Sequence, residues 1–229
     1  MRMGKVLLGL RMLRLAGLPL ENGEVFDYGF GAGTFYRYLP KTAEFFGVEQ
    51  DPVVCQEVAV MLKERGFKHI DLQPIEIKQW KEHPLLQKRY DLFLCSHVLE
   101  HLPDPIDFLK TVRPCVKPDG LFLGLVPINE RAESPHHLQK VDRAVVKGWA
   151  TDAGYEVAYY EENDPFPYWV QPLYTVTSGW KHKLAQAISL SLGMSATLCG
   201  ERLWFAWGRI FGRLTFSKPT QAAFILKKR

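Results

Sequence analysis

A short apolar stretch of this chain ends in an acidic residue and gives way to three alternate glycines. The segment reads Val25-Phe-Asp-Tyr-Gly-Phe-Gly-Ala-Gly-Thr34, so that Asp27 precedes Gly29, Gly31 and Gly33. Glycine adopts positive φ angles readily and lets a backbone approach a ligand, and the free amides that open a helix favour polar or anionic groups. The segment predicts a buried strand, a glycine turn and a helix that together bind a ligand.

The glycine spacing and a second acid narrow the kind of ligand. The order is G-x-G-x-G, and Thr34 stands where the dinucleotide fingerprint G-x-G-x-x-G has its third glycine, so a pyrophosphate cofactor fits poorly. Another apolar run, residues 45–48, ends at Glu49. An acid at this distance reaches the hydroxyls of a bound ribose. The two segments therefore indicate a ligand that carries a ribose.

Histidines that follow two later apolar runs are our candidates for a general base. His97 and His101 come after one run, and His136 lies after the next, with His137 beside it. Imidazole titrates near neutral pH, which suits proton transfer. For each of these histidines a structural hydrogen-bonding role is the alternative.

The segment His97-Val-Leu-Glu-His101 also matches the H-x-x-E-H pattern of one group of zinc proteases. That pattern places both histidines on one face of a helix, whereas this segment follows a predicted strand and precedes Leu-Pro-Asp-Pro. The four cysteines include no C-x-x-C pair, which favours buried free thiols in a reducing compartment over a zinc cluster or a disulfide. We expect no bound metal.

The elements that must position these residues alternate along the chain. Apolar runs predict seven strands at residues 24–28, 45–48, 69–72, 90–95, 121–126, 155–160 and 222–226. Periodic stretches predict helices at residues 1–18, 34–39, 51–65, 106–112 and 140–153, with Asp104 as the N-cap of the fourth. Strands that alternate with helices imply a parallel sheet.

Taken in order, these motifs resemble a known family. The glycine segment, Glu49, the segment Ser96-His-Val-Leu-Glu-His-Leu-Pro-Asp-Pro105 and the run Leu-Phe-Leu-Gly-Leu after Pro-Asp-Gly are similar to class I S-adenosylmethionine-dependent methyltransferases. Among them, the small-molecule members carry an H-V-L-E-H-L-x-D-P segment. The resemblance covers about residues 23–160 and the last strand. It implies an α/β fold, a doubly wound Rossmann-like sheet of seven strands whose last strand is antiparallel, with a helical insertion between strands six and seven.

The resemblance also implies which residues hold the methionine part of the cofactor, S-adenosylmethionine. Asp27 and the amides of residues 29–33 would bind it from one side. The backbone of Cys95, Ser96 and His97, at the carboxyl end of the fourth strand, would flank its carboxylate or amine. The family implies that the segment from His97 onward starts a helix beside the donor methyl group.

For the adenosine part of the cofactor, the resemblance implies contacts from the second and third strands. Glu49 would accept hydrogen bonds from both ribose hydroxyls, with Gln50 beside the adenine. In the family a residue just after the third strand contacts the adenine amine. Here that place is Gln73-Pro-Ile-Glu76, and Ile75 is our candidate within it.

Charge is distributed unevenly over the 229 residues. Residues 1–20 carry four basic and no acidic groups, residues 21–169 sixteen basic and twenty-four acidic, and residues 170–229 nine basic and one acidic. An acidic core argues against nucleic-acid binding, whereas the basic ends suit an anionic partner such as a membrane surface. Solvated lysine and arginine are the alternative. The first residues lack a signal-peptide pattern, so we expect a cytoplasmic protein, either free or peripheral to the membrane.

A helical wheel of the segment near residue 210 separates basic from apolar side chains. Three arginines fall on one stripe and six large apolar residues on the opposite face: Arg202, Arg209 and Arg213 against Leu203, Trp204, Trp207, Ile210, Phe211 and Leu214. Such a helix lies on an anionic bilayer, or it packs on the core or on a second copy in a homodimer. Both interpretations stay open at this point.

The sequence thus predicts four parts and one function. Residues 1–20 form a basic amphipathic helix, residues 21–160 the cofactor-binding core, residues 161–214 an aromatic and basic helical insertion facing the acceptor or a membrane, and residues 215–229 the final core strand. We expect methyl transfer to a small apolar or lipid-linked acceptor, at oxygen before nitrogen or carbon. The alternative is a non-catalytic binding or scaffold protein that keeps the fold. A nicotinamide-dependent dehydrogenase is the third and least favoured hypothesis for the function.

Overall fold

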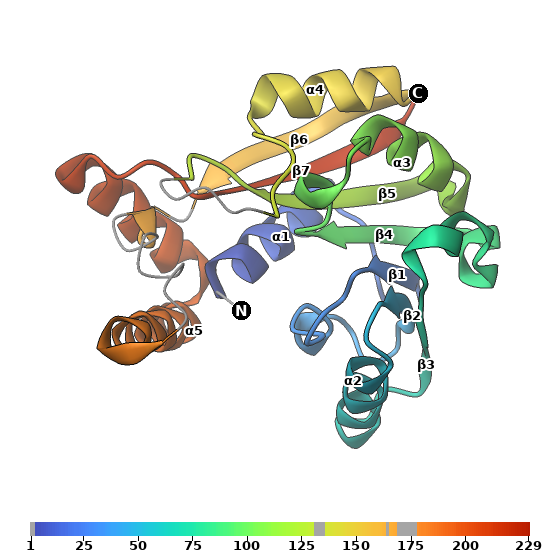
Figure 1. The fold of residues 1–229 in the computed structure, drawn as a ribbon, viewed down its shortest axis with the longest axis horizontal. Coiled ribbons are helices and arrows are strands. Elements are labelled where there is room, and N and C mark those ends of the chain that lie inside the picture. Colours follow the sequence, from blue (N-terminus) through green and yellow to red (C-terminus); the bar gives the residue numbers. More distant parts are fainter. Residues whose placement is uncertain (1–2, 131–135, 164, 169–177) are drawn as a thin grey trace.

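A single mixed sheet of seven strands organises the molecule (Figure 1). The computed structural model describes residues 3–130, 136–163, 165–168 and 178–229. The strand order is β3-β2-β1-β4-β5-β7-β6, and β7 runs antiparallel to both of its neighbours while the other pairs are parallel. The strands are β1 Glu24–Tyr28, β2 Glu44–Glu49, β3 His69–Pro74, β4 Tyr90–Ser96, β5 Val116–Pro127, β6 Tyr155–Asn163 and β7 Gln221–Lys228. The predicted fold class is confirmed.

Helices cover both faces of this sheet. They are α1 Met3–Ala16, α2 Pro52–Glu64, α3 Pro105–Val112, α4 Arg143–Asp152 and α5 Gly179–Thr215. Aspartate side chains cap three of them, and the predicted cap is among these: Asp104 accepts a hydrogen bond from the Asp107 amide at 2.9 Å. A proline at the first helical position starts both α2 and α3.

The hydrophobic core lies in two layers, one on each face of the sheet. Along β4, Leu92 and Leu94 face the layer that contains α1 and α2, whereas Phe93 and Cys95 face the layer that contains α3 and α4. Side chains of β4 are almost all buried because both faces of a parallel sheet are covered.

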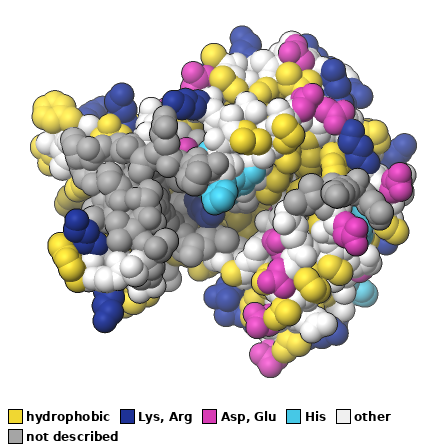
Figure 2. Space-filling view, viewed as in Figure 1, with side chains coloured by type: hydrophobic (Ala, Val, Ile, Leu, Met, Phe, Trp, Pro, Cys, Tyr) yellow, Lys and Arg dark blue, Asp and Glu magenta, His cyan; other side chains and the backbone are white. Residues whose placement is uncertain are grey.

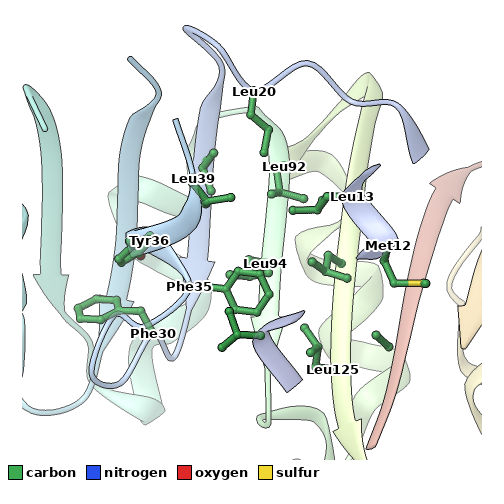
Figure 3. Close-up of a cluster of buried hydrophobic side chains, with 14 of the residues drawn as sticks. Met12, Leu13, Leu20, Phe30, Phe35, Tyr36, Leu39, Leu92, Leu94 and Leu125 are labelled. Atoms are coloured by element: carbon green, nitrogen blue, oxygen red, sulfur yellow. The ribbon is translucent and has the colours of Figure 1, made fainter. Parts of the chain in front are cut away.

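The two sides of the molecule differ in surface charge. In the space-filling view, Asp and Glu side chains lie mainly over the right-hand part, both at the top and where α2 lies, with Lys and Arg among them, whereas Lys, Arg and hydrophobic side chains border the left-hand part where α5 lies (Figure 2). A close view of the first core layer shows why α1 stays in place: Met12 and Leu13 lie among sheet residues such as Leu92 and Leu94 (Figure 3). Helix α1 is therefore part of the core.

One predicted helix does not form. The helix expected at residues 34–39 is wrong: only a 3-10 turn forms, at Tyr36–Tyr38, because Pro40 favours an extended Leu39, which has φ −92° and ψ 160°. Strand β5 starts at Val116, earlier than the expected residue 121, so it includes the segment Pro118-Asp-Gly120. Two 3-10 turns, Ile77–Glu82 and Pro84–Gln87, lie between β3 and β4.

Helix α5 makes up most of the segment between β6 and β7. Gly200 interrupts it with φ 66° and ψ 173°, so the helix consists of two halves. It packs against α1, and it contributes Ala196, Trp204 and Phe205 to the core. Among the described residues, no helix combines the length and apolarity that a membrane span requires.

The packing between β5 and β7 gives a stability test. A Cβ added to Gly124 would collide with the ring of Phe224 on the neighbouring strand, whereas one added to Gly148 on α4 meets nothing within 4 Å. Gly124→Ala is expected to lower the free energy of unfolding by about 1–3 kcal/mol through overpacking. Gly148→Ala, the same change in an exposed helix, should raise it by about 0.5–1 kcal/mol. Urea unfolding of both variants measures whether each substitution lowers or raises the free energy of unfolding. Equal changes in the two variants would contradict the close packing of Gly124 against Phe224.

Candidate functional site

The carboxyl ends of three parallel strands meet where the strand order reverses. Strand β1 lies between β2 and β4, and Tyr28 stands level with Val48 on one side and with Cys95 on the other. In open α/β sheets such a reversal leaves a crevice beyond the strand ends, and ligands bind there. Residues that follow β1, β2 and β4 therefore share one edge of the sheet.

The glycine turn after β1 has the predicted conformation. Gly29, Gly31 and Gly33 have φ angles of 73°, 49° and 60°, values that other residues rarely adopt. A Cβ at Gly29 would lie 2.7 Å from Val98, and one at Gly33 would lie 2.6 Å from Val58. A Cβ at Gly31 would meet nothing within 4 Å. The turn is thus closely packed at both ends and open at Gly31, where a ligand can approach the backbone.

Glu49, at the end of β2, is fixed by this turn. Its Oε2 accepts a hydrogen bond from the Gly31 amide, and its Oε1 accepts one from the Gln50 amide, both at 2.8 Å. Each carboxylate oxygen keeps a further lone pair for a hydroxyl. A hollow of about 460 Å³ adjoins these groups, with Gly31, Glu49 and Val58 in its wall.

Asp27 is a buried carboxyl group at the end of β1. Its Oδ1 has no hydrogen-bond partner among the described residues. Burial raises the pKa of Asp27 well above its usual value, the nearby Glu49 raises it further, and the positive charge of Lys5 on α1 opposes both. A buried carboxyl group without a partner suits a cationic ligand group. The Oγ of Ser96, at the end of β4, is also buried and without a partner among the residues described.

The remaining predicted cofactor residues line the same sheet edge. Ile75 directly follows β3, is buried, and donates its amide to the Glu49 carbonyl at 2.9 Å. Cys95 is fully buried, and burial raises the pKa of its thiol well above the usual value. Gln50 follows Glu49 at the surface side of this edge. All three positions lie at strand ends that face the crevice.

His97 has a backbone conformation that the sequence did not indicate. Its φ is 59°, and its amide donates to the Leu125 carbonyl of β5 at 2.8 Å. The helix expected from His97 onward is wrong: only a 3-10 turn forms at Leu99–His101, and α3 begins at Pro105. A left-handed residue at the end of β4 turns the chain away from the helical direction, so the two histidines do not share a helical face.

The imidazole of His97 faces a buried carboxylate. Its Nδ1 lies 3.1 Å from Oε1 of Glu100, which is fully buried. Burial lowers the pKa of His97, and Lys5 lowers it further, against the opposing effects of Glu100 and Gln221. The imidazole is therefore neutral near pH 7. Its Nε2 is buried and has no hydrogen bond of good geometry within the described part of the chain, although the Gln221 side chain lies close enough to the imidazole to interact with it.

Glu100 is the residue of this site to which the sequence assigned no separate role. Burial acts to raise the pKa of Glu100, but its interactions with His97 and His101 outweigh burial and lower the pKa overall. The apolar neighbours Val98, Leu99 and Leu102 are the only sequence signal that this carboxylate is buried.

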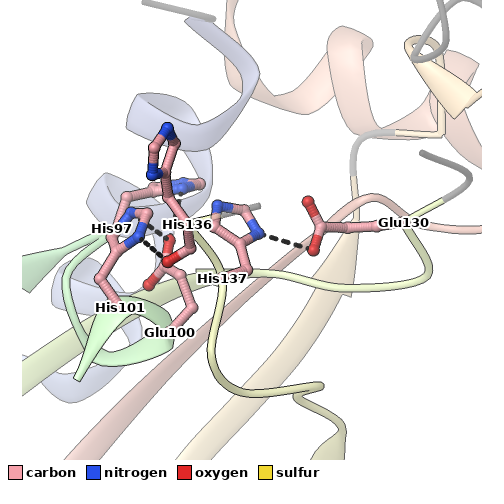
Figure 4. A network of polar contacts seen from close by, with 6 residues as sticks. All are labelled: His97, Glu100, His101, Glu130, His136 and His137. Carbon is pink, nitrogen blue, oxygen red and sulfur yellow. Dashed lines mark hydrogen bonds and ion pairs between the residues drawn. The ribbon is translucent and has the colours of Figure 1, made fainter. Parts of the chain in front are cut away.

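Glu100 also joins the loop after β5 to the site (Figure 4). Its carbonyl accepts hydrogen bonds from the amides of Leu138 and Gln139, at 2.8 and 3.1 Å. Nδ1 of His101 lies 2.8 Å from the carbonyl oxygen of His136, so His136 contributes its backbone to the cluster. These contacts hold two loops, one after β4 and one after β5, against each other.

A second hollow, of about 380 Å³, lies beside this cluster. Its wall includes Ile128, Glu130, His137 and Val141. His137 is held by Glu130, whose Oε2 lies 2.8 Å from its Nδ1. The hollow thus combines apolar surface with an imidazole, a lining that suits a small organic molecule.

Three side chains in this cluster could hold a metal ion. Glu100, His101 and His137 each offer one ligand atom, and these atoms lie within 4.8 Å of one another. The absence of a metal stays a prediction, and this cluster is the place where a bound ion would contradict it.

Comparisons with known proteins agree with this geometry. A family model described as a methyltransferase domain matches residues 5–161. This chain belongs to the methyltransferase domain family. The match includes the glycine turn, Glu49 and the histidine cluster, and the family predicted from the motifs is confirmed.

Curated relatives match only part of the chain. A ubiquinone biosynthesis O-methyltransferase from Histophilus somni (strain 2336) is 28% identical over 106 residues, which is 45% of this chain and 44% of that protein. The protein of the same name from Proteus mirabilis (strain HI4320) is 27% identical over 111 residues, 48% of this chain and 44% of that protein. The chain thus spans less than half the length of these relatives.

Solved structures share the fold over most of the chain. An S-adenosylmethionine-dependent methyltransferase from Geobacter sulfurreducens, in complex with S-adenosyl-L-homocysteine, has a TM-score of 0.61 at 12% identity and covers 96% of this chain and 90% of its own. An S-adenosylmethionine-dependent methyltransferase from Aquifex aeolicus has a TM-score of 0.57 at 21% identity and covers 69% of this chain and 86% of its own. The [4+2]-cyclase SpnF has a TM-score of 0.57 at 15% identity and covers 94% of this chain and 80% of its own.

The conformation of His97 leads to a test of its backbone. Asparagine adopts positive φ more readily than other residues, whereas a β-branched side chain at positive φ is strained. His97→Val is expected to lower the free energy of unfolding by about 1–3 kcal/mol relative to His97→Asn. Urea unfolding of the two variants gives this difference. Equal stabilities would show that the left-handed conformation is not required.

Proposed function

We propose that this chain transfers the methyl group of S-adenosylmethionine to an oxygen of a small apolar acceptor. The observation that carries the proposal is the unpartnered, buried carboxyl group of Asp27 beside a glycine turn that opens toward Glu49. When bound, S-adenosylmethionine supplies a methyl group that its sulfonium already activates. The chain then needs only to position the acceptor and to take up its proton.

The residues at the sheet edge fit this cofactor. Asp27 presents an acceptor for the cationic amine of the methionine part, together with the amides of residues 29–33. Glu49, oriented by the amides of Gly31 and Gln50, has lone pairs for the ribose hydroxyls. Ile75 and Gln50 would flank the adenine, and the backbone of residues 95–97 would flank the methionine carboxylate.

His97 is the group that we propose takes the proton from the acceptor. Because Nδ1 of His97 faces Glu100, we assign the hydrogen to Nδ1, which leaves a lone pair on Nε2. His101 is the second candidate: its Nδ1 is directed at the His136 carbonyl, and its Nε2 lies 4.0 Å from Oε1 of Glu100. His136 would act only by orienting His101.

The class of acceptor rests on the hollow beside the histidines and on the relatives. Apolar side chains of Ile128 and Val141 share its wall with His137. The named curated relatives are O-methyltransferases of ubiquinone biosynthesis, which supports transfer to oxygen. We therefore propose an apolar or lipid-linked small molecule with a hydroxyl group, and a protein of the small-molecule branch of the family.

The second candidate function is a binding or scaffold protein that keeps the fold and the cofactor site without turnover. The likeness to a [4+2]-cyclase keeps this candidate open only because it shows that the fold by itself does not fix methyl transfer as the function. Binding of S-adenosylmethionine without methyl transfer to any hydroxyl acceptor would support it. The presence of a neutral His97 beside the site favours catalysis instead.

Further proposals concern the organisation and location of the chain. We propose the division into an N-terminal helix at residues 1–20, which packs in the hydrophobic core, a cofactor-binding part at 21–160, an insertion at 161–214 and a final strand at 215–229. We propose action in the cytoplasm, with peripheral membrane association, and without nucleic acid as a partner because the core is acidic. A homodimer is the competing use of the insertion.

Removal of the Glu49 carboxylate tests the cofactor site. Glu49→Ala leaves the ribose hydroxyls and the amides of Gly31 and Gln50 without their acceptor, so affinity for S-adenosylmethionine should fall by about 2–4 kcal/mol. Glu57 lines the same hollow without replacing Glu49 as the acceptor of the Gly31 and Gln50 amides, and Glu57→Ala is the matched control. Calorimetric titration of both variants measures the affinities. Unchanged binding by Glu49→Ala would overturn the assignment.

Replacement of His97 tests proton transfer. His97→Asn keeps a side chain that tolerates the left-handed backbone, but it removes the base, so kcat should fall by about 10²–10⁴-fold while affinity for the cofactor stays within about twofold. The assay follows labelled methyl groups from S-adenosylmethionine to a series of alkylphenols and alkylcatechols. His69→Asn, on exposed β3, is the control. A wild-type rate in His97→Asn would exclude His97 as the base.

A further inference from the structure

Helix α5 exposes a continuous apolar stripe in its second half. Leu203, Trp207, Ile210 and Leu214 follow one another at spacings of four, three and four, so they lie on one side of the helix. They are 58%, 59%, 48% and 76% exposed. Large apolar side chains that line one side of a helix are normally buried against the rest of the protein or against a binding partner.

The first half of the helix, on the other side of the break at Gly200, also exposes large apolar side chains. Five large apolar side chains there are also exposed: Trp180, Leu184, Leu190, Met194 and Leu198. We call the nine side chains of both halves the α5 stripe. Residues from α5 account for most of the large hydrophobic side chains that the described part of the molecule exposes.

Packing on the core does not explain the α5 stripe, because a different side of the helix does that. Trp204 and Phe205 are buried in the core, and the ring of Phe166 lies 4.3 Å from that of Trp204 and 5.0 Å from that of Phe211. The sequence placed Trp204 and Phe211 on one apolar face with Leu203. The structure divides that face into a packed side and an exposed side.

Basic side chains accompany the exposed side. The exposed lysines and arginines of α5, together with one in the short segment between α5 and β7, are Lys181, Lys183, Arg202, Arg209, Arg213 and Lys218. Over residues 165–229 the sequence contains one acidic residue, Glu201. The same side of the molecule shows dark-blue and yellow side chains in the space-filling view (Figure 2).

We propose that the α5 stripe docks on an anionic membrane surface, with the helix lying in the plane of the headgroups. Apolar side chains on one side of a helix enter the acyl boundary, and tryptophans such as Trp180 and Trp207 favour the interface between headgroups and chains. Lysine and arginine beside them attract anionic lipid. The surface thus combines the two attractions that an interfacial helix needs.

A second copy of the chain suits this surface less well. A two-fold contact would bring the basic side chains of both copies into one interface. Like charges at an interface disfavour association unless enough acids pair with them. Glu161 and Glu162 share a hollow with Arg209 and Arg213, and Glu201 is the one acid in residues 165–229, so basic groups still exceed acidic ones on this side. The excess of positive charge favours an anionic lipid surface.

The position of α5 connects such docking to the site. Helix α5 packs against α1. The positive charge of Lys5 on α1 acts to lower the pKa of both Asp27 and His97. In Figure 1, α5 lies on the side of the molecule toward which β4 points, the side of the strand ends that carry the site. Docking through α5 would bring that edge toward the bilayer, from which an apolar acceptor can enter.

Vesicle co-sedimentation of the full chain tests the proposal. The chain is expected to sediment with phosphatidylcholine vesicles that contain phosphatidylserine and to stay in the supernatant with phosphatidylcholine alone. A combined variant, Leu203→Gln with Trp207→Gln and Ile210→Gln, should lose at least about tenfold in vesicle affinity. Val53→Gln with Val60→Gln, on exposed positions of α2, is the control and should bind as the wild type does.

A charge variant separates the two attractions. Arg202→Gln with Arg209→Gln and Arg213→Gln should abolish the preference for phosphatidylserine. Circular dichroism and the affinity for S-adenosylmethionine must stay at wild-type values in every variant, which separates docking from folding and from the proposed catalysis. No sedimentation of the wild type with anionic vesicles would overturn the proposal, as would equal loss in the α2 control or a stable dimer that buries the α5 stripe.

Discussion

One buried residue holds the two loops of the candidate site together. The carboxylate of Glu100 is fully buried and lies 3.1 Å from the His97 imidazole, and the Glu100 carbonyl accepts hydrogen bonds from the amides of Leu138 and Gln139. A buried carboxylate is costly unless charges or hydrogen bonds compensate it, and His97 and His101, both in the loop after β4, supply that compensation. The backbone hydrogen bonds hold the loop after β5 against this group, and the hollow beside His137 depends on the position of that loop.

A second buried carboxyl group marks the cofactor side of the same sheet edge. Asp27 lies at the end of β1 without a hydrogen-bond partner for Oδ1 among the described residues, and burial raises its pKa. Glu49 at the end of β2, in contrast, accepts two backbone hydrogen bonds. The Glu49 carboxylate thus has hydrogen-bond donors within the chain, whereas Oδ1 of Asp27 is left for a cationic ligand group. This difference is the physical basis for placing the cofactor at this edge.

Local patterns in the sequence predicted the parts of the fold that depend on local physics. Apolar runs located all seven strands, the glycines adopted positive φ, and Asp104 capped α3 as expected. Features that depend on tertiary contacts were not predictable in this way. The left-handed φ of His97 follows from the approach of β5, and the exposed side of α5 follows from which of its apolar residues meet α1 and the core.

The most direct test of the account is calorimetric titration of the wild-type chain with S-adenosylmethionine, in two buffers of different ionisation enthalpy and with NAD as the control. Because a bound cation favours the ionised form of Asp27, whose pKa is raised in the free protein, binding should release a proton. We predict saturable binding of S-adenosylmethionine with proton release that Asp27→Asn removes, and no binding of NAD. Absence of binding, or binding of NAD with equal affinity, would contradict it.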